Sequence, residues 1–385
     1  MKTLAFSNFR MVLADRIVHG TLELDENGTI VALDEDPRPR SGSEDGQGDW
    51  LLPGLVDVHT DNLERQVQPR SNVRWPSRSA FLAHDSQCAA AGITTVADAL
   101  CVGDAGFESQ RIQTLRDAIV DLTFLEKQGL LRSDHVLHLR CELPTPNMQA
   151  LFETAMAQAP IHMISLMDHT PGVGQHANLD KFRESRRGDG YSEAELEQMI
   201  QESQQRRETY SEKNRQYLLH TLQEMATRQG IHLQIASHDD RTAEEIQRNA
   251  KEGIRIAEFP VSMEAAQEAG RLGMATVAGA PNVVRGGSHS GNVAVKDLVA
   301  AGLVQVLASD YVPHALLEAA FALTRMGLTD LPGALRMVSL APAQMLGLED
   351  RGAIAVGLRG DLLRVGSAAD LPHLRAVWKA GERIA

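Results

Sequence analysis

The sequence predicts an α/β fold, a (β/α)8 barrel of the TIM type with a small β domain formed from both chain termini. Three observations support this prediction. Eight short apolar runs rich in β-branched residues follow one another, the segments between them are long enough for crossover helices, and strand-like patterns flank the series at both ends. We expect residues 51–344 to form the barrel, and residues 1–50 and 345–385 to form a composite β-sandwich domain.

The eight runs are almost continuously hydrophobic rather than alternating, which is typical of strands buried on both faces. They cover residues 50–58, 92–100, 135–143, 162–170, 231–239, 253–261, 274–282 and 303–311. After the fourth run the chain leaves this pattern in a long polar insertion at about 172–216. Insertions of this length in compact domains are usually lids, binding loops or disordered segments.

The sequence pattern at both ends of the chain predicts short strands. Near the start, "RMVLADRIVHGTLELDENGTIVALDE" carries an Asn27-Gly28 turn between two alternating segments. Near the end, "RGDLLRVG" and "LRAVWKAGERI" have the same strand-like composition. We therefore expect the two ends to pair with each other in one small β domain.

Composition narrows the classes of function. The chain has 385 residues, is 43% hydrophobic, and has no apolar run long enough to cross a bilayer and no pattern of a secretory signal. Its three cysteines are too few and too scattered for a disulfide framework, which predicts buried thiols and a cytoplasmic location. A net charge of −13 argues against nucleic-acid and membrane partners. An anionic substrate would then need local basic groups or metal ions.

Ligand-type side chains fall at the carboxyl ends of the predicted strands, where such a barrel places its chemistry. Imidazole and carboxylate groups suit divalent cations, and a two-metal site needs about this many of them. Each residue alone could equally be a solvated or hydrogen-bonded polar group, and only their coincidence at strand ends favours a metal site. The candidate ligands are His59, Asp61, Glu142, His169, His238 and Asp310. Asp168, Asp239 and Asp240 lie beside them and could orient them, or could be solvated loop carboxylates.

Two segments offer basic or polar groups for an anion. The insertion carries Lys181, Arg183, Arg186 and Arg187 just after His169, and guanidinium groups suit phosphate oxygens. A charged surface helix hairpin is an equally good interpretation, because the segment balances acids and bases. The loop "NVVRGGSHSGN" is more specific, since its glycines let the backbone approach a ligand. Its candidate binding groups are Arg285, Ser288, His289, Ser290 and Asn292.

Several motifs resemble a known group. "PGLVDVHTD" and "APAQMLGLEDRGAIAVGLRGDLLRV" are similar to the amidohydrolase superfamily, metal-dependent hydrolase barrels with a composite terminal β domain. "HTDNLE", "MDHTPG", "SHDD", "GAPNVVRGGSHSGN" and "LASDYVP" resemble its branch of α-D-ribose 1-methylphosphonate 5-triphosphate diphosphatases, of the carbon–phosphorus lyase pathway. The chain has no evident lysine for the carbamate bridge common in the superfamily, so Glu142 is our candidate for that role, and the sixth run ends without a histidine.

This resemblance implies hydrolysis of the triphosphate to the 5-phosphate and pyrophosphate, in phosphonate metabolism. It implies two divalent metal ions, with Zn²⁺ favoured over Mn²⁺ and Fe²⁺, which lower the pKa of a bound water. Asp310 would accept the proton of that water, and His289 would help to stabilise charge on the phosphoryl oxygens. We expect a small anionic triphosphate as substrate and a homo-oligomer, a dimer or larger.

The sequence lacks the motifs of several other classes of enzyme. "GVGQHA" lacks the third glycine of a dinucleotide fingerprint, there is no GxxxxGK[ST] motif, and "GGSHSG" has histidine where a nucleophile elbow needs serine. An amidohydrolase that acts on a cyclic amide or deaminates a small molecule is the alternative, and it has little need for the basic groups. A non-catalytic relative would be expected to have lost ligands.

Overall fold

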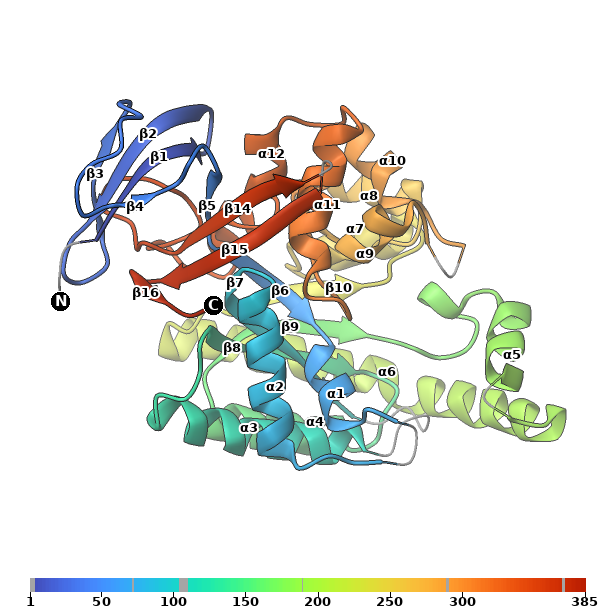
Figure 1. Ribbon diagram of the computed structural model, residues 1–385. Helices are drawn as coiled ribbons and strands as arrows, with labels where there is room; N and C mark the ends of the chain where they lie inside the picture. Colours follow the sequence, from blue (N-terminus) through green and yellow to red (C-terminus); the bar gives the residue numbers. More distant parts are fainter. Residues whose placement is uncertain (1–3, 71–72, 104–109, 189, 289–290, 369–370) are drawn as a thin grey trace.

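The computed structural model describes residues 4–70, 73–103, 110–188, 190–288, 291–368 and 371–385. Within these residues it contains two eight-stranded sheets, a parallel barrel sheet and a mixed sheet from the two chain ends. In Figure 1 the blue amino-terminal strands and the red carboxy-terminal strands lie together on one side of the barrel. The predicted barrel with an added terminal β domain is thus confirmed.

The barrel strands follow one another in sequence order around the sheet, and every neighbouring pair is parallel. The last strand returns to the first through a parallel bridge between Thr60 and Asp310. Each of the eight predicted runs overlaps a barrel strand. The strands are β6 (Leu55–Thr60), β7 (Ile93–Val102), β8 (Asp134–Glu142), β9 (Ile161–Met167), β10 (Gln234–His238), β11 (Ile256–Glu258), β12 (Ala275–Gly279) and β13 (Val306–Ala308).

The burial of these strands explains their composition. All residues of β6 and β7 are buried, as expected for strands covered by side chains inside the barrel and by helices outside it. The barrel interior is filled by an apolar cluster to which several strands each contribute branched or small side chains. The cluster includes Val56, Val58, Ala97, Met163, Ala236, Ile256, Val277 and Val306.

The first apolar run, 50–58, does not form one strand as we expected. Its first half, β5 (Trp50–Pro53), belongs to the terminal sheet, and its second half begins the barrel as β6. Gly54 separates the two halves, and its backbone N–H donates to the carbonyl of Asp361 over 2.8 Å. A Cβ added to Gly54 would lie 2.4 Å from Thr94 Oγ1, so a side chain here would clash with the start of β7.

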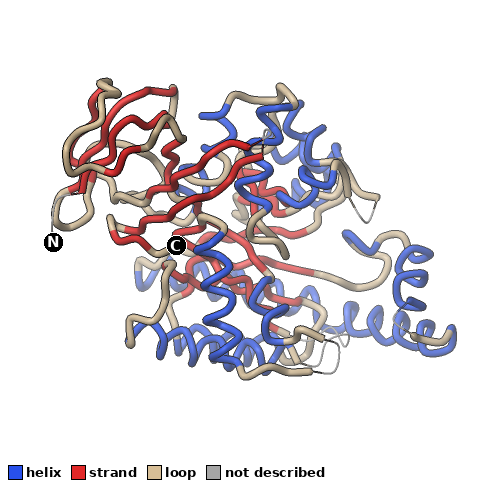
Figure 2. The backbone as a smooth tube through the Cα atoms, viewed as in Figure 1, coloured by secondary structure: helices blue, strands red, loops and turns tan. Residues whose placement is uncertain are grey.

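Helices connect the barrel strands and surround them, as Figure 2 shows. Up to the insertion they are α1 (Asn62–Val67), α2 (Ser77–Ala90), α3 (Arg111–Lys127) and α4 (Met148–Gln158). The insertion holds the 3-10 helix η1 (Gly174–His176), α5 (Leu179–Gly188) and α6 (Glu193–Gln229). The rest are α7 (Ala243–Lys251), α8 (Met263–Arg271), α9 (Ala280–Arg285), α10 (Val295–Ala300), α11 (Ala315–Arg325), α12 (Leu331–Arg336) and α13 (Leu340–Met345).

The insertion is a helix hairpin that extends away from the barrel strands (Figure 1). Helix α6 begins at a capping box in which Ser192 and Glu195 satisfy each other's backbone N–H groups. Its far half is anchored to the barrel, because the buried Asn214 amide donates to the carbonyls of Leu143 and Thr145, both over 2.8 Å. The near half and α5 therefore project from a fixed base.

The terminal sheet joins the two chain ends through β5, which pairs in parallel with β1 and antiparallel with β14. The Asn27-Gly28 turn links β2 to β3, and Gly28 has a φ of 78°. The strands are β1 (Leu4–Val12), β2 (Ile17–Leu24), β3 (Ile30–Asp34), β4 (Glu44–Asp45), β5, β14 (Leu362–Ala368), β15 (Leu371–Lys379) and β16 (Glu382–Arg383). The predicted pairing of the two ends is confirmed.

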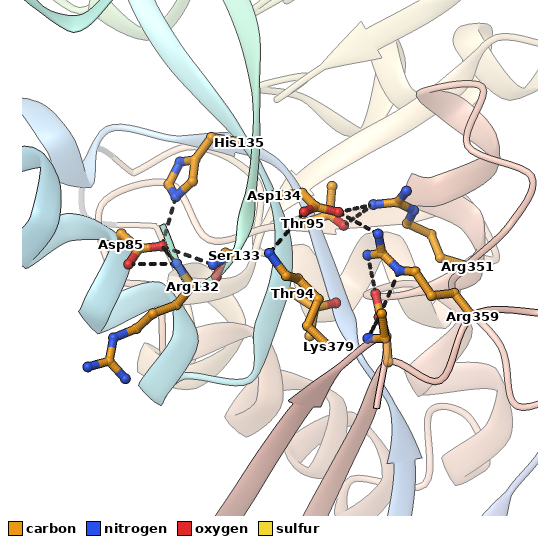
Figure 3. A network of polar contacts seen from close by, with 12 residues as sticks. Asp85, Thr94, Thr95, Arg132, Ser133, Asp134, His135, Arg351, Arg359 and Lys379 are labelled. Atoms are coloured by element: carbon orange, nitrogen blue, oxygen red, sulfur yellow. Dashed lines mark hydrogen bonds and ion pairs between the residues drawn. The ribbon is translucent and has the colours of Figure 1, made fainter. Parts of the chain in front are cut away.

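An ion-pair network fastens the terminal segments to the amino end of β8 (Figure 3). Asp134 Oδ2 accepts from Arg351 and Arg359, both at 2.6 Å, and Asp134 Oδ1 accepts from Lys379 at 3.1 Å. Because these groups lie at the amino end of the strand, they stabilise the barrel and leave the opposite end free for chemistry.

Two further expectations can be compared with the structure. Cys88, Cys101 and Cys141 are free and buried, as predicted. Among the described residues, no helix combines the length and the apolar character needed to cross a membrane.

Candidate metal-dependent active site

A cavity of about 350 Å³ opens at the carboxyl ends of the barrel strands. Five of the six predicted ligands line it: His59, Asp61, His169, His238 and Asp310. They come from β6 and the residue that follows it, from the segment after β9, from β10 and from the segment after β13. The barrel geometry therefore gathers residues up to 251 positions apart, because parallel strands end at the same rim.

His59 is held by a buried carboxylate. Its Nδ1 atom lies 2.8 Å from Glu258 Oε1, at the end of β11, and both side chains are almost fully buried. Burial alone would lower the pKa of His59, but the charge of Glu258 and the bond to Asp61 raise that pKa to about 10. Since Nδ1 is engaged by Glu258, Nε2 remains on the side of Asp61, which lies 3.6 Å away.

Glu142 supports His169 in the same way. Its Oε2 atom lies 2.7 Å from His169 Nδ1, and its Oε1 atom accepts the backbone N–H of His169 over 2.8 Å. Burial would raise the pKa of Glu142, but His169 outweighs this effect and lowers it to about 2. The sequence predicts that Glu142 binds metal directly. Both of its oxygens contact His169, and Glu142 is not among the residues that line the cavity.

His238 and Asp239 form the second part of the site with His169. His238 Nδ1 lies 3.1 Å from Asp239 Oδ2, and His169 Nε2 lies 3.8 Å from the same oxygen. His238 Nε2 is buried and makes no hydrogen bond within the described part of the chain, and Glu258 Oε2 lies 3.6 Å from it. Asp239 also has a φ of 57°, a left-handed conformation that is costly for a residue with a side chain. A buried imidazole nitrogen without a hydrogen bond, beside a strained segment, indicates that a bound ligand completes the site.

Asp310 lies where the barrel closes. Its N–H donates to the carbonyl of His59 over 3.0 Å, and its carbonyl accepts from Asp61 N–H over 2.6 Å. Burial, and next to it the charge of Asp61, raise the pKa of Asp310 to about 6. Burial would also raise the pKa of Asp61, but the neighbouring Arg140 guanidinium lowers it below its usual range.

The donor atoms of the site could hold metal ions, and they fall into two groups. Ligand atoms of His59, Asp61 and Asp310 lie within 4.8 Å of one another, and so do those of His169, His238 and Asp239. Imidazole and carboxylate donors in two adjacent groups suit Zn²⁺, Mn²⁺ or Fe²⁺. A further group, His84, Asp98 and His135, lies in a closed network of hydrogen bonds with Asp85 and is better explained as structural.

The loop after β12 also faces the cavity. Arg285, Ser288 and Asn292 line it, together with Gly287. His289 and Ser290, which we also predicted to bind substrate or stabilise charge, lie outside the described residues.

The structure separates the four basic residues of the insertion. Arg186 lines the cavity and lies 5.6 Å above the ring of Phe182. Lys181 lines a neighbouring cavity. Arg183 instead pairs with Glu197 at 3.3 Å and Asp180 at 3.7 Å, and Arg187 pairs with Glu193. Two of the four basic residues therefore line cavities, and the other two form ion pairs within the insertion.

Sequence reasoning missed two buried charged groups in the site. Glu258 lies within the sixth apolar run, at the end of β11, and Arg140 lies in the third, where it pairs with Asp61. The sequence did contain a signal for both residues, since each is a charged residue within an otherwise apolar run. A charged side chain is buried in a barrel only when another group pairs with it. Of the predicted orienting residues, Asp239 lies in the site, whereas Asp168 pairs with Arg207 at 2.6 Å and Asp240 accepts from Ser237 and Asn249.

Known proteins share this architecture. The profile of the amidohydrolase family matches residues 215–385. The chain is 40% identical over 381 residues to the α-D-ribose 1-methylphosphonate 5-triphosphate diphosphatase of Escherichia coli strain K12, over 98% of this chain and 99% of that protein. Solved structures with a similar fold include N-isopropylammelide isopropylaminohydrolase from Burkholderia multivorans, with a TM-score of 0.64, 19% identity, and 100% and 98% coverage of the two chains. Dihydropyrimidinase from Brevibacillus agri has a TM-score of 0.64, 13% identity, and 99% and 95% coverage.

Fold, donor set and relatives together define a metal-dependent hydrolase of the amidohydrolase superfamily. Within that superfamily, the chain belongs to the family of α-D-ribose 1-methylphosphonate 5-triphosphate diphosphatases.

Proposed function

We propose that this enzyme hydrolyses α-D-ribose 1-methylphosphonate 5-triphosphate to the 5-phosphate and pyrophosphate. The 40% identity to a diphosphatase of that name, over nearly the whole of both chains, carries the proposal. The cavity supports it, because Arg186 and Arg285 line it together with the metal-type donors, on a chain with a net charge of −13. Cyclic-amide or deaminase chemistry would leave these cations without a role.

His59, Asp61 and Asp310 would hold one divalent ion, and His169, His238 and Asp239 a second, with Zn²⁺ as our first choice. When bound, such ions supply an activated water at neutral pH and stabilise charge on phosphoryl oxygens. Glu258 and Glu142 fix the rings of His59 and His169 through their Nδ1 atoms, so that each Nε2 keeps its direction.

Asp310 is our candidate for the group that accepts the proton of the attacking water. Ligand atoms of Asp310, His59 and Asp61 lie within 4.8 Å of one another, so the Asp310 carboxylate can reach a water that an ion held there would activate. In the balanced reaction, one P–O bond of the anhydride breaks, one forms between phosphorus and the water oxygen, and the water protons are released to Asp310 and the products. Arg186, Arg285 and the donors of Ser288 and Asn292 would bind the phosphoryl oxygens.

The test is turnover of the triphosphate by metal-reconstituted protein, with phosphorus NMR of the products. Formation of equal amounts of pyrophosphate and the 5-phosphate supports the proposal, and reaction in ¹⁸O-labelled water identifies the attacked phosphorus. Release of inorganic phosphate alone, or turnover of dihydrouracil in place of the triphosphate, would overturn it.

We also propose that the enzyme works in the cytoplasm as a homo-oligomer. Three free, buried cysteines are suited to a reducing compartment. Light scattering of the purified protein measures the assembly, and a mass near 42.0 kDa would contradict the oligomer.

A further inference from the structure

A second cavity adjoins the active site on the side of the insertion. Its volume is about 510 Å³, and it shares Gln175, His176, Arg186 and Asn292 with the main cavity. We call it the annex. Because four residues line both, the two cavities are direct neighbours.

The annex is a cationic compartment. Lys181, Arg186 and Arg241 line it, and Glu184 is the acidic residue among its lining side chains. This excess of positive charge contrasts with the chain as a whole, which has a net charge of −13. The Arg241 guanidinium has no ion-pair or hydrogen-bond partner in the described part of the chain. Its backbone is nevertheless fixed, since Arg241 N–H donates to Glu245 Oε2 over 2.6 Å.

Lys181 connects the insertion to the loop after β12. Its Nζ atom approaches the backbone of Gly291 so closely that a Cβ added there would lie 2.1 Å from it. Gly291 has a φ of 77°, so both the space and the backbone conformation favour glycine. The ammonium group therefore stands at the border between helix α5 and the loop that carries Asn292.

The main cavity has several apolar side chains along one wall, whereas Phe182 is the apolar side chain among the residues that line the annex. Phe259, Val261, Val293 and Leu298 line the main cavity on the side of β11, β12 and α10. A sugar ring and a methyl group fit beside such a wall, whereas a free diphosphate group would lose its hydration there without compensation. The substrate of the proposed reaction has both kinds of end, a methylphosphonoribosyl group and a highly charged diphosphate.

We propose that the annex binds the terminal diphosphate of the substrate, and that the methylphosphonoribosyl end lies against the apolar wall of the main cavity. This inference depends on the proposed function. It makes Arg241 and Lys181 specificity-determining residues that bind the departing pyrophosphate, and it fixes the direction in which the substrate lies. Hydrolysis then leaves pyrophosphate in the annex and the 5-phosphate in the main cavity.

The test measures inhibition of triphosphate turnover by each product separately. The proteins are the wild type, Lys181→Gln, Arg241→Gln and the control Lys213→Gln, which removes the same charge from an exposed position on α6 outside both cavities. We expect the inhibition constant of pyrophosphate to rise about tenfold in the two annex variants and to stay unchanged in the control. The inhibition constant of the 5-phosphate should stay within about twofold in all of them.

Three results would overturn the inference: an unchanged constant for pyrophosphate, an equal rise for both products, or a selective rise for the 5-phosphate, which would reverse the direction of the substrate. Calorimetric binding of pyrophosphate to metal-loaded protein gives a second readout that needs no turnover. If the wild type does not hydrolyse the triphosphate, the proposed function fails, while weaker pyrophosphate binding in the annex variants would still identify the annex as a diphosphate site.

Discussion

Replacing Glu258 by glutamine should weaken metal binding while leaving the fold intact. Glu258 is fully buried, and its Oε1 and Oε2 atoms accept from His59 Nδ1 at 2.8 Å and from Ser165 Oγ at 2.7 Å. Burial would raise the pKa of Glu258, but His59 lowers it, so the group is ionised. Glutamine has nearly the same shape and can still accept from His59, because its amide oxygen replaces one carboxylate oxygen. The variant therefore removes charge rather than packing.

The expected loss of metal affinity follows from the position of the Glu258 carboxylate, which contacts the imidazole nitrogen that does not face the metal site. Loss of such a partner usually costs 10- to 100-fold in metal affinity, or about 1.4–2.7 kcal/mol. We expect this loss for Glu258→Gln, with about two ions still bound at saturation. Glu142→Gln is the matched variant, because Glu142 contacts His169 Nδ1 at 2.7 Å in the same arrangement.

The assay is competition for Zn²⁺ between the metal-free protein and a chromophoric chelator, with elemental analysis of the saturated protein. Glu197→Gln, an exposed carboxylate on α6, is the control for loss of charge alone. Unchanged affinity in Glu258→Gln would refute the orienting role. If Glu142→Gln loses one ion outright instead of affinity, Glu142 is a direct ligand, as the sequence first led us to expect.

Three further predictions concern catalysis, recognition and stability. Asp310→Asn should lower the turnover rate at least about 100-fold with at least one metal ion still bound, as measured by kinetics and elemental analysis; a near-normal rate would remove Asp310 from the mechanism. Arg186→Gln should lower kcat/KM about tenfold, because Arg186 lines the cavity. Arg187→Gln breaks only an exposed pair with Glu193 and should have a much smaller effect. Equal losses in the two variants would contradict the different roles given to these two arginines. Burial lowers the pKa of His135, but Asp98 and Asp85 outweigh it and raise that pKa to about 9, above the unfolded value of about 6.5 (Figure 3 shows His135 with Asp85). The charged His135 therefore stabilises the fold fully below about pH 6.5, and this stabilisation is lost as the pH rises through about 9. The difference in melting temperature between wild type and His135→Gln should shrink over that range. A difference that stays constant with pH would contradict this reasoning.

The fold and the approximate place of the site were predictable because both depend on local patterns. A strand buried on both faces must be apolar along its length, and the barrel then forces every strand end to the same rim. His59, Asp61, His169, His238 and Asp310 could therefore be grouped before their distances were known. The division of the first run at Gly54 was not predictable, because an apolar stretch looks the same in either sheet.

The roles within the site depended on tertiary structure. Glu258 and His59 are 199 residues apart, and Glu142 lies 27 residues from His169, so no local pattern shows which carboxylate meets which imidazole. Arg186 and Arg187 are neighbours in the sequence, yet successive residues on a helix point about 100° apart, so one lines the cavity and the other pairs with Glu193. Hydrophobic periodicity specifies which residues are buried. Only the closed barrel, with the insertion anchored beside it, specifies which buried or exposed charges lie within contact distance of one another.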